Sequence, residues 1–201
     1  VYKPVGPTSH DIIEEIRKIT GVKKVGHAGT LDPLAKGVLV VGVGREATKR
    51  LQEIVGKEKE YLATVKLGEE STTDDREGTK TKVGVIKRPT LFEIRKALRG
   101  FRGEIMQRPP RYSAVKIKGK EAYKYARRGE HVELAPRKAL VKHIRLLRYR
   151  WPYVKLRFVT GPGVYVRSLA RDIGEVLGTG GYLYGLERTR VGNFRKEDAV
   201  T

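Results

Sequence analysis

Residues 26–43 read GHAGTLDPLAKGVLVVGV, a glycine-rich segment that runs into an apolar stretch. Gly26 and Gly29 allow backbone angles that other residues avoid, and they allow a ligand to approach closely. Asp32 precedes a proline, which restricts the backbone of the aspartate and holds its carboxylate in a fixed direction. The residues alone leave two interpretations open, an ordinary Asp-Pro turn or a carboxylate placed to react. The apolar stretch at 38–43 predicts a buried strand after the loop.

The charge of the chain bounds its partners. Its 201 residues include 43 lysines and arginines against 23 aspartates and glutamates, which gives a formal net charge of +20. A field this positive attracts polyanions and speeds their capture. The alternative is the charged surface of a heat-tolerant protein, but such surfaces usually mix both signs. The excess therefore favours a nucleic-acid partner.

Other classes of protein are disfavoured by what the chain lacks. No stretch approaches the roughly eighteen apolar residues of a membrane span, and the first residues, VYKPVGPTSHD, have no apolar signal-peptide core. Cysteine is absent, which excludes disulfides and thiolate chemistry. The four histidines (His10, His27, His131 and His143) show no metal-ligand spacing. We expect a cytoplasmic protein without a membrane segment and without a metal site.

Hydrophobic periodicity predicts helices and strands that do not alternate regularly. Helices are expected over 8–20, 45–56, 90–100 and about 119–128, and the first and third open with capping-box spacing. Strands are expected over 59–67, 139–150, 153–160 and near 182–194, a loop or hairpin over 68–84, and a short strand leading into a helix over 164–178. This mixture favours an α+β fold with a mixed, largely antiparallel central sheet flanked by helices. We expect a single domain, 1–201, with an irregular insertion at about 106–136.

Motifs along the chain resemble one family. HAGTLDPLAKGVLVVGVG, residues 27–44, resembles the catalytic motif of the TruB family of tRNA pseudouridine synthases. The segments YKPVGPTSHD, KEYLATVKLG, STTDDREG, GPGVYVRSLARDIGEVLG and YLYGLERTRVGNF resemble further parts of that family. RPPRYSAVKIKGKEAYKYARRGE resembles its RNA-gripping insertion. Together these segments cover nearly the whole chain in the order of the family.

The resemblance implies the pseudouridine synthase fold and the isomerisation of uridine to pseudouridine in the T loop of tRNA, at position 55. It implies that Asp32 is the catalytic aspartate, that Tyr61 stacks on the target base and that Arg167 pairs with the catalytic carboxylate. It also implies that Tyr165 and Leu186 line the uracil pocket. By residue type alone, the tyrosines and the leucine would be ordinary half-buried or core residues, and the arginine a member of a surface ion pair.

Two further residues take roles from the same resemblance. His27 matches the histidine that occupies the space left by the flipped nucleotide, although it could simply form a hydrogen bond within its loop. Asp75 lies in a loop that the family places near RNA. The resemblance implies no cofactor, because the reaction is not a redox reaction. The pattern Gly42, Gly44, Ala47 resembles a dinucleotide loop only weakly, because no βαβ unit with a well-placed acidic residue supports it.

The insertion combines basic and aromatic residues. Between 108 and 128 there are eight basic residues, one acid, Glu121, and interleaved tyrosines. A charge run is often only a solvated face, but cations together with aromatic rings favour RNA contact. Such contacts can offset the few kcal/mol that extrusion of a base from folded RNA costs. The expected RNA-binding residues here are Arg108, Tyr112, Lys116 and Lys118.

The chemistry gives a physical reason to expect Arg167 beside Asp32. A carboxylate that acts as nucleophile or proton shuttle has to be ionised, whereas a dry pocket raises its pKa. A guanidinium nearby opposes that rise and fixes the orientation of the carboxylate. Whether the aspartate attacks the sugar, attacks the base or assists a glycal route is not decided by the sequence.

The sequence leaves open the domain content of the protein, its dependence on partners and its catalytic role. Family members usually continue into a C-terminal PUA domain, which this chain is expected to lack, either as a truncated chain or as a minimal member. A related branch forms the catalytic subunit of guide-RNA-dependent particles and needs protein partners, whereas PLAKG favours the stand-alone type. A non-catalytic RNA-binding or RNA-folding protein is the remaining alternative. We expect a monomer that binds the T arm of tRNA without an obligate protein partner.

Overall fold

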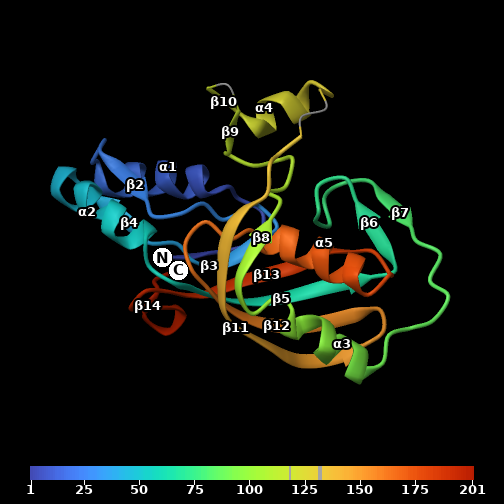
Figure 1. The fold of residues 1–201 in the computed structure, drawn as a ribbon. Coiled ribbons are helices and arrows are strands. Elements are labelled where there is room, and N and C mark those ends of the chain that lie inside the picture. Colours follow the sequence, from blue (N-terminus) through green and yellow to red (C-terminus); the bar gives the residue numbers. More distant parts are fainter. Residues whose placement is uncertain (118, 131–132) are drawn as a thin grey trace.

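One sheet organises the described part of the protein, residues 1–117, 119–130 and 133–201 of the computed structural model (Figure 1). Its eight strands take the order β1-β3-β13-β5-β12-β11-β8, with β14 paired to β13. Only β3 and β13 are parallel, and the other pairs are antiparallel. The strands are β1 (Tyr2–Lys3), β3 (Ala35–Val38), β5 (Lys59–Leu67), β8 (Gly103–Gln107), β11 (Arg137–Arg150), β12 (Tyr153–Thr160), β13 (Gly181–Val191) and β14 (Phe194–Arg195).

Helices cover one face of this sheet. α3 (Leu91–Arg99) and α5 (Val166–Val176) pack on it and bury the main core against β5, β11, β12 and β13 (Figure 1). α1 (Ser9–Thr20), α2 (Arg45–Val55) and the pair β2 (Val25–His27) with β4 (Val41–Val43) form a lobe at one end. The predicted α+β class, with its mixed and largely antiparallel sheet flanked by helices, is confirmed.

Smaller elements complete the fold. The expected hairpin after β5 is β6 (Glu69–Ser71) and β7 (Lys80–Lys82). The insertion contains β9 (Lys116–Ile117), β10 (Lys120–Glu121) and α4 (Ala122–Arg127), and it stands out from the sheet above β8 and β11 (Figure 1). A 3₁₀ turn, η1 (Lys196–Asp198), ends the chain. No helix among the described residues is long and apolar enough to cross a membrane.

Helix starts follow the predicted capping boxes. In α1 the Thr8 hydroxyl accepts a hydrogen bond from the Asp11 N–H, and the Asp11 carboxylate accepts one from the Thr8 N–H. Thr90 and Glu93 make the same reciprocal pair at α3. These bonds satisfy N–H groups that have no partner inside a helix, so the two helices begin where the sequence predicted.

The single buried strand predicted over 38–43 is wrong. β3 ends at Val38 and belongs to the main sheet, whereas β4 begins at Val41 and pairs with β2. Between them the backbone changes partners: the Leu39 N–H donates to Val1, and the Val40 carbonyl accepts from Ala28. A continuous apolar run shows that the residues are buried but does not show which sheet they join.

Alternation along β5 sets up the site. Tyr61, Ala63 and Val65 are buried on the helix-covered face, whereas Leu62 and Thr64 are half-buried on the other face. Successive side chains of a strand point to opposite sides, so this register turns the tyrosine toward the helices.

Candidate active site

The loop that carries Asp32 connects β2 to β3 and is fixed from α1. The Ser9 hydroxyl donates to the Leu31 carbonyl at 2.9 Å and accepts from the Leu31 N–H at 2.8 Å, and both bonds are buried. The Asp32 carbonyl accepts from the Ala35 N–H at 3.0 Å, which closes the expected Asp-Pro turn. The two interpretations of the sequence are therefore compatible, because the Asp-Pro turn itself orients the carboxylate of Asp32.

Arg167 meets this carboxylate from the first turn of α5. Its Nε lies 3.0 Å from Asp32 Oδ2, so the predicted ion pair is present. The arginine side chain is 9% exposed and the aspartate side chain 39% exposed. Burial raises the pKa of Asp32, the positive charge of Arg167 opposes this rise, and the negative charge of Asp75 adds to it.

The same guanidinium contacts two further parts of the chain. Its Nη1 lies 3.5 Å from Asp75 Oδ2 and donates to the Thr73 carbonyl at 3.3 Å, and its Nη2 donates to the Tyr112 carbonyl at 2.9 Å. Asp75 is 3% exposed and accepts hydrogen bonds from the Thr73 hydroxyl and from the Glu77 N–H. Arg167 thus ties the aspartate loop to the β6–β7 hairpin and to the base of the insertion.

Tyr61 lies under the aspartate loop, beside Arg188 on the neighbouring strand β13. Its side chain is buried, and this burial raises the pKa of its hydroxyl, while the charge of Arg188 and a hydrogen bond with it oppose the rise. The charge of Asp32 also acts on the hydroxyl. The structure therefore brings together Asp32, Tyr61, Arg167 and Asp75.

Arg188 is a residue that sequence reasoning missed. It is 1% exposed, and its guanidinium donates to three backbone carbonyls: Val38 at 2.8 Å, Gly29 at 3.0 Å and Thr30 at 3.4 Å. Among the residues that the structure describes, no carboxylate lies within ion-pair distance of it. Its charge is solvated by the carbonyls of the aspartate loop and of β3, so it holds that loop from below.

Two buried lysines likewise donate hydrogen bonds to backbone carbonyls. Lys3 donates to the carbonyls of Pro4 at 2.8 Å and Pro7 at 2.7 Å, and burial lowers its pKa while the charge of Asp32 opposes that change. Lys59 donates to two carbonyls at the end of α2, and burial together with the charge of Arg188 lowers its pKa to about 8. The alternation of the predicted strand 59–67 places Lys59 at an inward position, which was the signal available in the sequence.

Tyr165 and Leu186 lie on different elements. Tyr165 precedes α5 as its N-cap residue rather than sitting on the predicted strand, because its N–H and carbonyl bond to the side chain of Gln107 instead of to a strand. The Arg137 guanidinium lies 5.0 Å from its ring centre. Leu186 is half-buried on β13, opposite Ala63 of β5 and Ala35 of β3.

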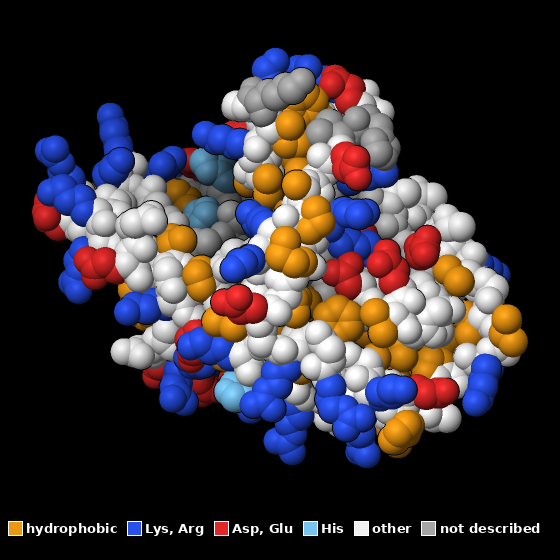
Figure 2. All heavy atoms as spheres, viewed as in Figure 1, with side chains coloured by type: hydrophobic (Ala, Val, Ile, Leu, Met, Phe, Trp, Pro, Cys, Tyr) orange, Lys and Arg blue, Asp and Glu red, His pale blue; other side chains and the backbone are white. Residues whose placement is uncertain are grey.

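His27 ends β2. Its Nδ1 is buried and has no hydrogen-bond partner among the described residues. Burial lowers its pKa, and the charge of Arg188 lowers it further, so the neutral ring is favoured. Figure 2 shows a hollow between the insertion and the lobe of α1 and α2, with histidine side chains inside it and Lys and Arg side chains on both rims.

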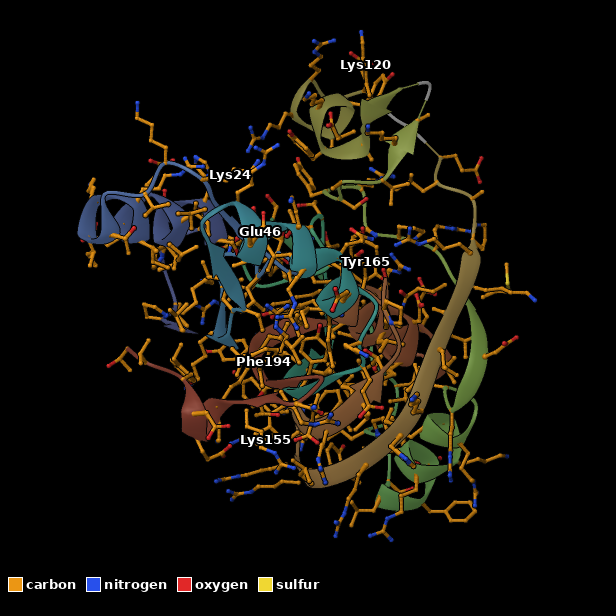
Figure 3. The ribbon with its side chains drawn as sticks, turned by 90° about the vertical axis from the view of Figure 1, so that its left-hand side faces the viewer. Lys24, Glu46, Lys120, Lys155, Tyr165 and Phe194 are labelled. Atoms are coloured by element: carbon orange, nitrogen blue, oxygen red, sulfur yellow. The ribbon has the colours of Figure 1, made fainter. Side chains whose placement is uncertain are left out.

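The predicted RNA-binding residues of the insertion are not all near the carboxylate. The Arg108 carbonyl accepts from the Ser168 hydroxyl and from Arg171, and Tyr112 is tied to Arg167 through its own carbonyl, so both lie at the base of the insertion next to α5. Lys116 is exposed on β9, and Lys118 lies outside the described residues. Lys24 of the lobe and Lys120 of the insertion lie at the same end of the molecule (Figure 3).

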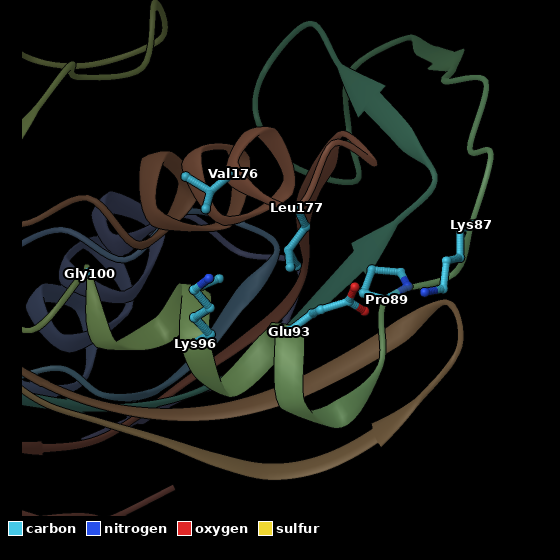
Figure 4. Close-up of a pocket in the computed structure, with 8 residues that line it drawn as sticks. Lys87, Pro89, Glu93, Lys96, Gly100, Val176 and Leu177 are labelled. Carbon is cyan, nitrogen blue, oxygen red and sulfur yellow. The ribbon is translucent and has the colours of Figure 1, made fainter.

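A different hollow, of about 570 Å³, lies between α3 and the end of α5 (Figure 4). Its one acidic group, Glu93, already caps α3, and none of the predicted site residues lines it. Within the described ranges no cluster of three or more histidines, aspartates or glutamates could hold a metal ion.

Comparisons with known proteins agree with this arrangement. Residues 17–166 match the family described as TruB family pseudouridylate synthase (N terminal domain), and residues 167–201 match the tRNA pseudouridylate synthase B C-terminal domain. Relatives named tRNA pseudouridine synthase B are found in Corynebacterium diphtheriae, with 46% identity over 208 residues, and in Clostridium tetani, with 44% over 200 residues. Each match covers 100% of this chain and 69% of the relative.

Solved structures of similar fold include a Cbf5-Nop10-Gar1 complex, with a TM-score of 0.75, 33% identity and coverage of 97% of this chain and 48% of that chain. The archaeal box H/ACA sRNP Nop10-Cbf5 complex gives a TM-score of 0.72 at 29% identity and covers 100% of this chain and 49% of that chain. This chain thus spans about half the length of those proteins. From the family match over residues 17–166 and the relatives aligned along the whole sequence, it follows that the chain belongs to the TruB family of pseudouridylate synthases.

Proposed function

We propose that this protein converts uridine to pseudouridine in the T loop of tRNA, at position 55, with Asp32 as the reactive carboxylate. One observation carries the proposal. The Asp32 carboxylate lies 3.0 Å from a buried guanidinium, in a chain whose relatives are named tRNA pseudouridine synthase B.

The reaction breaks the bond between N1 of uracil and C1′ of ribose and forms a bond between C5 and C1′. C5 loses a proton and N1 gains one, so the substrate and the product have the same atoms and no electrons are transferred. Asp32 acts as nucleophile or as proton carrier, and either role needs the ionised carboxylate. Arg167 favours that form and holds it in one orientation, while Lys3 adds a second positive charge.

The remaining site residues handle the base and the RNA. Tyr61 stacks on the uracil while it is detached, Tyr165 and Leu186 line its pocket, and His27 fills the gap that the flipped nucleotide leaves. Arg108 and Tyr112 contact the RNA near the base of the insertion, and Lys116 contacts it farther out, with Lys118 as a further candidate contact. Asp75 is buried and therefore acts through Arg167 rather than by touching the RNA. Phosphate contacts offset the few kcal/mol that base extrusion costs. The protein works as a monomer in the cytoplasm, without a cofactor or a partner protein.

A second candidate follows from the solved structures, in which the similar chain, Cbf5, is part of a complex with Nop10. On that reading the protein is the catalytic subunit of a guide-RNA-dependent enzyme. The relatives named tRNA pseudouridine synthase B share 44–46% identity with this chain, against 29–33% for the Cbf5 chains, which favours the stand-alone enzyme.

The test uses unmodified full-length tRNA and the purified protein alone. Pseudouridine mapped to the T-loop uridine, and absent from a transcript with cytidine there, is the expected result. Product only after addition of a guide RNA and partner proteins would support the second candidate. Tight RNA binding without product under either condition would contradict both and leave a binding or folding role.

A further inference from the structure

A second basic surface lies on the open face of the sheet, opposite the face that buries Tyr61. A hollow of about 530 Å³ opens there over β11, β12, β5 and β13, with Thr64 of β5 in its floor. We call it the Tyr153 surface, and its other lining residues are Arg148, Arg150, Trp151, Tyr153, Lys155 and Tyr184. Because Thr64 and Tyr61 point to opposite sides of one strand, the sheet separates this surface from the active site.

Two tyrosine rings stand side by side on this surface. Tyr153 of β12 and Tyr184 of β13 meet edge to face, with ring centres 5.2 Å apart and an angle of 66° between the ring planes. Their side chains are 36% and 40% exposed. The edge-to-face contact between the two rings is favourable, and it leaves ring surface free to contact a third planar group.

The cations around these rings lack the ion pairs that other cations on the same face of the sheet make. Farther along, Arg157 pairs with Glu60 at 2.5 Å and Lys66 pairs with Glu69 at 2.8 Å. Among the described residues no carboxylate lies within 4.0 Å of the charged groups of Arg148, Arg150 or Lys155. The register places Lys155 directly between Arg148 and Thr64, so these charges gather beside the rings.

The surface lies away from the rims of the active site. Lys155 is at the opposite end of the molecule from Lys120 and Lys24 (Figure 3). Lys and Arg side chains gather along the edge where Figure 1 places β11 and β12 (Figure 2). An RNA held in the hollow with the basic rims would leave the Tyr153 surface free.

We propose that the Tyr153 surface binds a single-stranded RNA segment at the same time as the active site holds its own substrate. The bases stack on Tyr153 and Tyr184, and the phosphates lie against Arg148, Arg150 and Lys155. Exposed aromatic rings on the open face of a sheet, flanked by unneutralised cations, match the chemistry of unpaired RNA, whose bases offer planar faces and whose backbone carries the opposite charge. This binding does not depend on the proposed isomerisation.

The test measures binding of a labelled oligo(A) of about ten nucleotides, a length that one such platform accommodates. This probe contains no uridine, so the enzyme cannot modify it. The protein is first saturated with an unlabelled T-arm hairpin that carries cytidine at the target position, and the anisotropy of the oligo(A) is then followed. Wild type is expected to bind one oligo(A) per protein molecule under these conditions.

Three variants test whether the rings and the cations of the Tyr153 surface bind the oligo(A). The double variant Tyr153→Ala/Tyr184→Ala is expected to bind oligo(A) roughly tenfold or more weakly, and Tyr153→Phe/Tyr184→Phe to bind like wild type because the rings remain. The triple variant Arg148→Gln/Arg150→Gln/Lys155→Gln is expected to lower the slope of log affinity against log salt by about 2, at about 0.7 for each lost phosphate contact. All three are expected to modify a T-arm hairpin at the wild-type rate, which shows that they fold.

The matched control removes the same charge from the other face of the sheet. Arg95→Gln/Lys96→Gln/Arg99→Gln takes three exposed cations from α3 and is expected to leave oligo(A) binding nearly unchanged. Equal weakening by this control would mean that only net charge attracts the oligonucleotide, and the proposal would be overturned. It would also be overturned by unchanged binding in the Tyr→Ala variant, or by a wild-type dimer that this variant dissociates.

Discussion

The two sides of the Asp32 loop are held by arginines in opposite ways. On the outer side, Arg167 faces two carboxylates, Asp32 at 3.0 Å and Asp75 at 3.5 Å. On the inner side, Arg188 has no carboxylate within ion-pair distance among the described residues. It donates to the carbonyls of Gly29, Thr30 and Val38 and lies beside the Tyr61 hydroxyl. We propose that the outer cation sets the charge and direction of the reactive carboxylate, whereas the inner cation fixes the backbone from which that carboxylate projects. The difference predicts that the outer arginine affects turnover and the inner one affects folding.

The largest effect is expected from Arg188→Met. It leaves three carbonyls without their donor, one in a buried and two in partly buried hydrogen bonds, and the free energy of unfolding is expected to fall by about 3–5 kcal/mol. Urea unfolding followed by circular dichroism measures this change. The control Arg190→Met, two residues along β13, removes a half-buried cation that pairs with Glu58, and it is expected to lower stability by about 1 kcal/mol or less. Equal losses of stability in Arg188→Met and Arg190→Met would contradict the special role in folding that we assign to Arg188.

Arg167→Lys is expected to reduce kcat by about 10- to 100-fold, because a single ammonium cannot keep the bonds to Asp32, Asp75 and the Tyr112 carbonyl. Single-turnover kinetics on a T-arm hairpin measure the change, and unfolding is expected to be affected less than in Arg188→Met. Arg171→Lys on the same helix keeps an ion pair with Asp74 and serves as the control, with kcat near wild type. Turnover near wild type in Arg167→Lys would refute the role given to the guanidinium.

The pH dependence of activity tests the electrostatics on the outer side of the Asp32 loop. Burial raises the pKa of Asp32 and the charge of Asp75 adds to the rise, so activity is expected to fall as the pH drops through that pKa. Asp75→Asn removes a negative neighbour and therefore lowers the pKa of Asp32. The acid limb of kcat/KM is therefore expected to move to lower pH. Glu104→Gln, an exposed acid on β8, is the control, and a shift upward in Asp75→Asn would contradict the assignment.

Tyr61→Phe is expected to have the smallest effect. The variant keeps the ring that we propose stacks on the base, and it loses only the hydroxyl beside Arg188. We expect kcat to fall less than about tenfold, in line with the loss of one hydrogen bond, while hairpin affinity stays the same. Tyr61→Leu, which removes the aromatic face as well, is the comparison. A loss in Tyr61→Phe as large as in Tyr61→Leu would move the hydroxyl into the chemical steps.

Local patterns predicted the parts of the fold that depend on neighbouring residues. The capping boxes at Thr8 and Thr90 and the alternation along 59–67 each follow from interactions within a few residues, and each is present. The pairing of Arg167 with Asp32 is also present, but it was implied by the family resemblance; the need of a buried carboxylate for a nearby cation gave a physical reason for it. The break after Val38 depends on which distant strand each half joins, and the apolar run does not contain that information.

The inner cations were missed for a related reason. Lysines and arginines are usually exposed, so Lys59 and Arg188 would by default be placed on the surface. The alternation along 59–67 indicated an inward Lys59, whereas the burial of Arg188 becomes visible only when β5 and β13 are paired and the Asp32 loop is seen to lie over that arginine. Tyr165 was expected on a strand because its neighbours are apolar, but Gln107 from another part of the chain takes both of its backbone groups.

The most direct test of the central claim is nucleoside mass spectrometry of a uridine-containing T-arm hairpin after incubation with wild type or Asp32→Asn, without added cofactor, alongside the binding affinity of each protein for the hairpin. The asparagine keeps the shape of the side chain and removes the charge that Arg167 faces. The account predicts pseudouridine at the target with wild type only, and binding that is as tight in the variant as in wild type. Pseudouridine from Asp32→Asn at the wild-type rate, or no product from a wild-type protein that binds the hairpin, would contradict it.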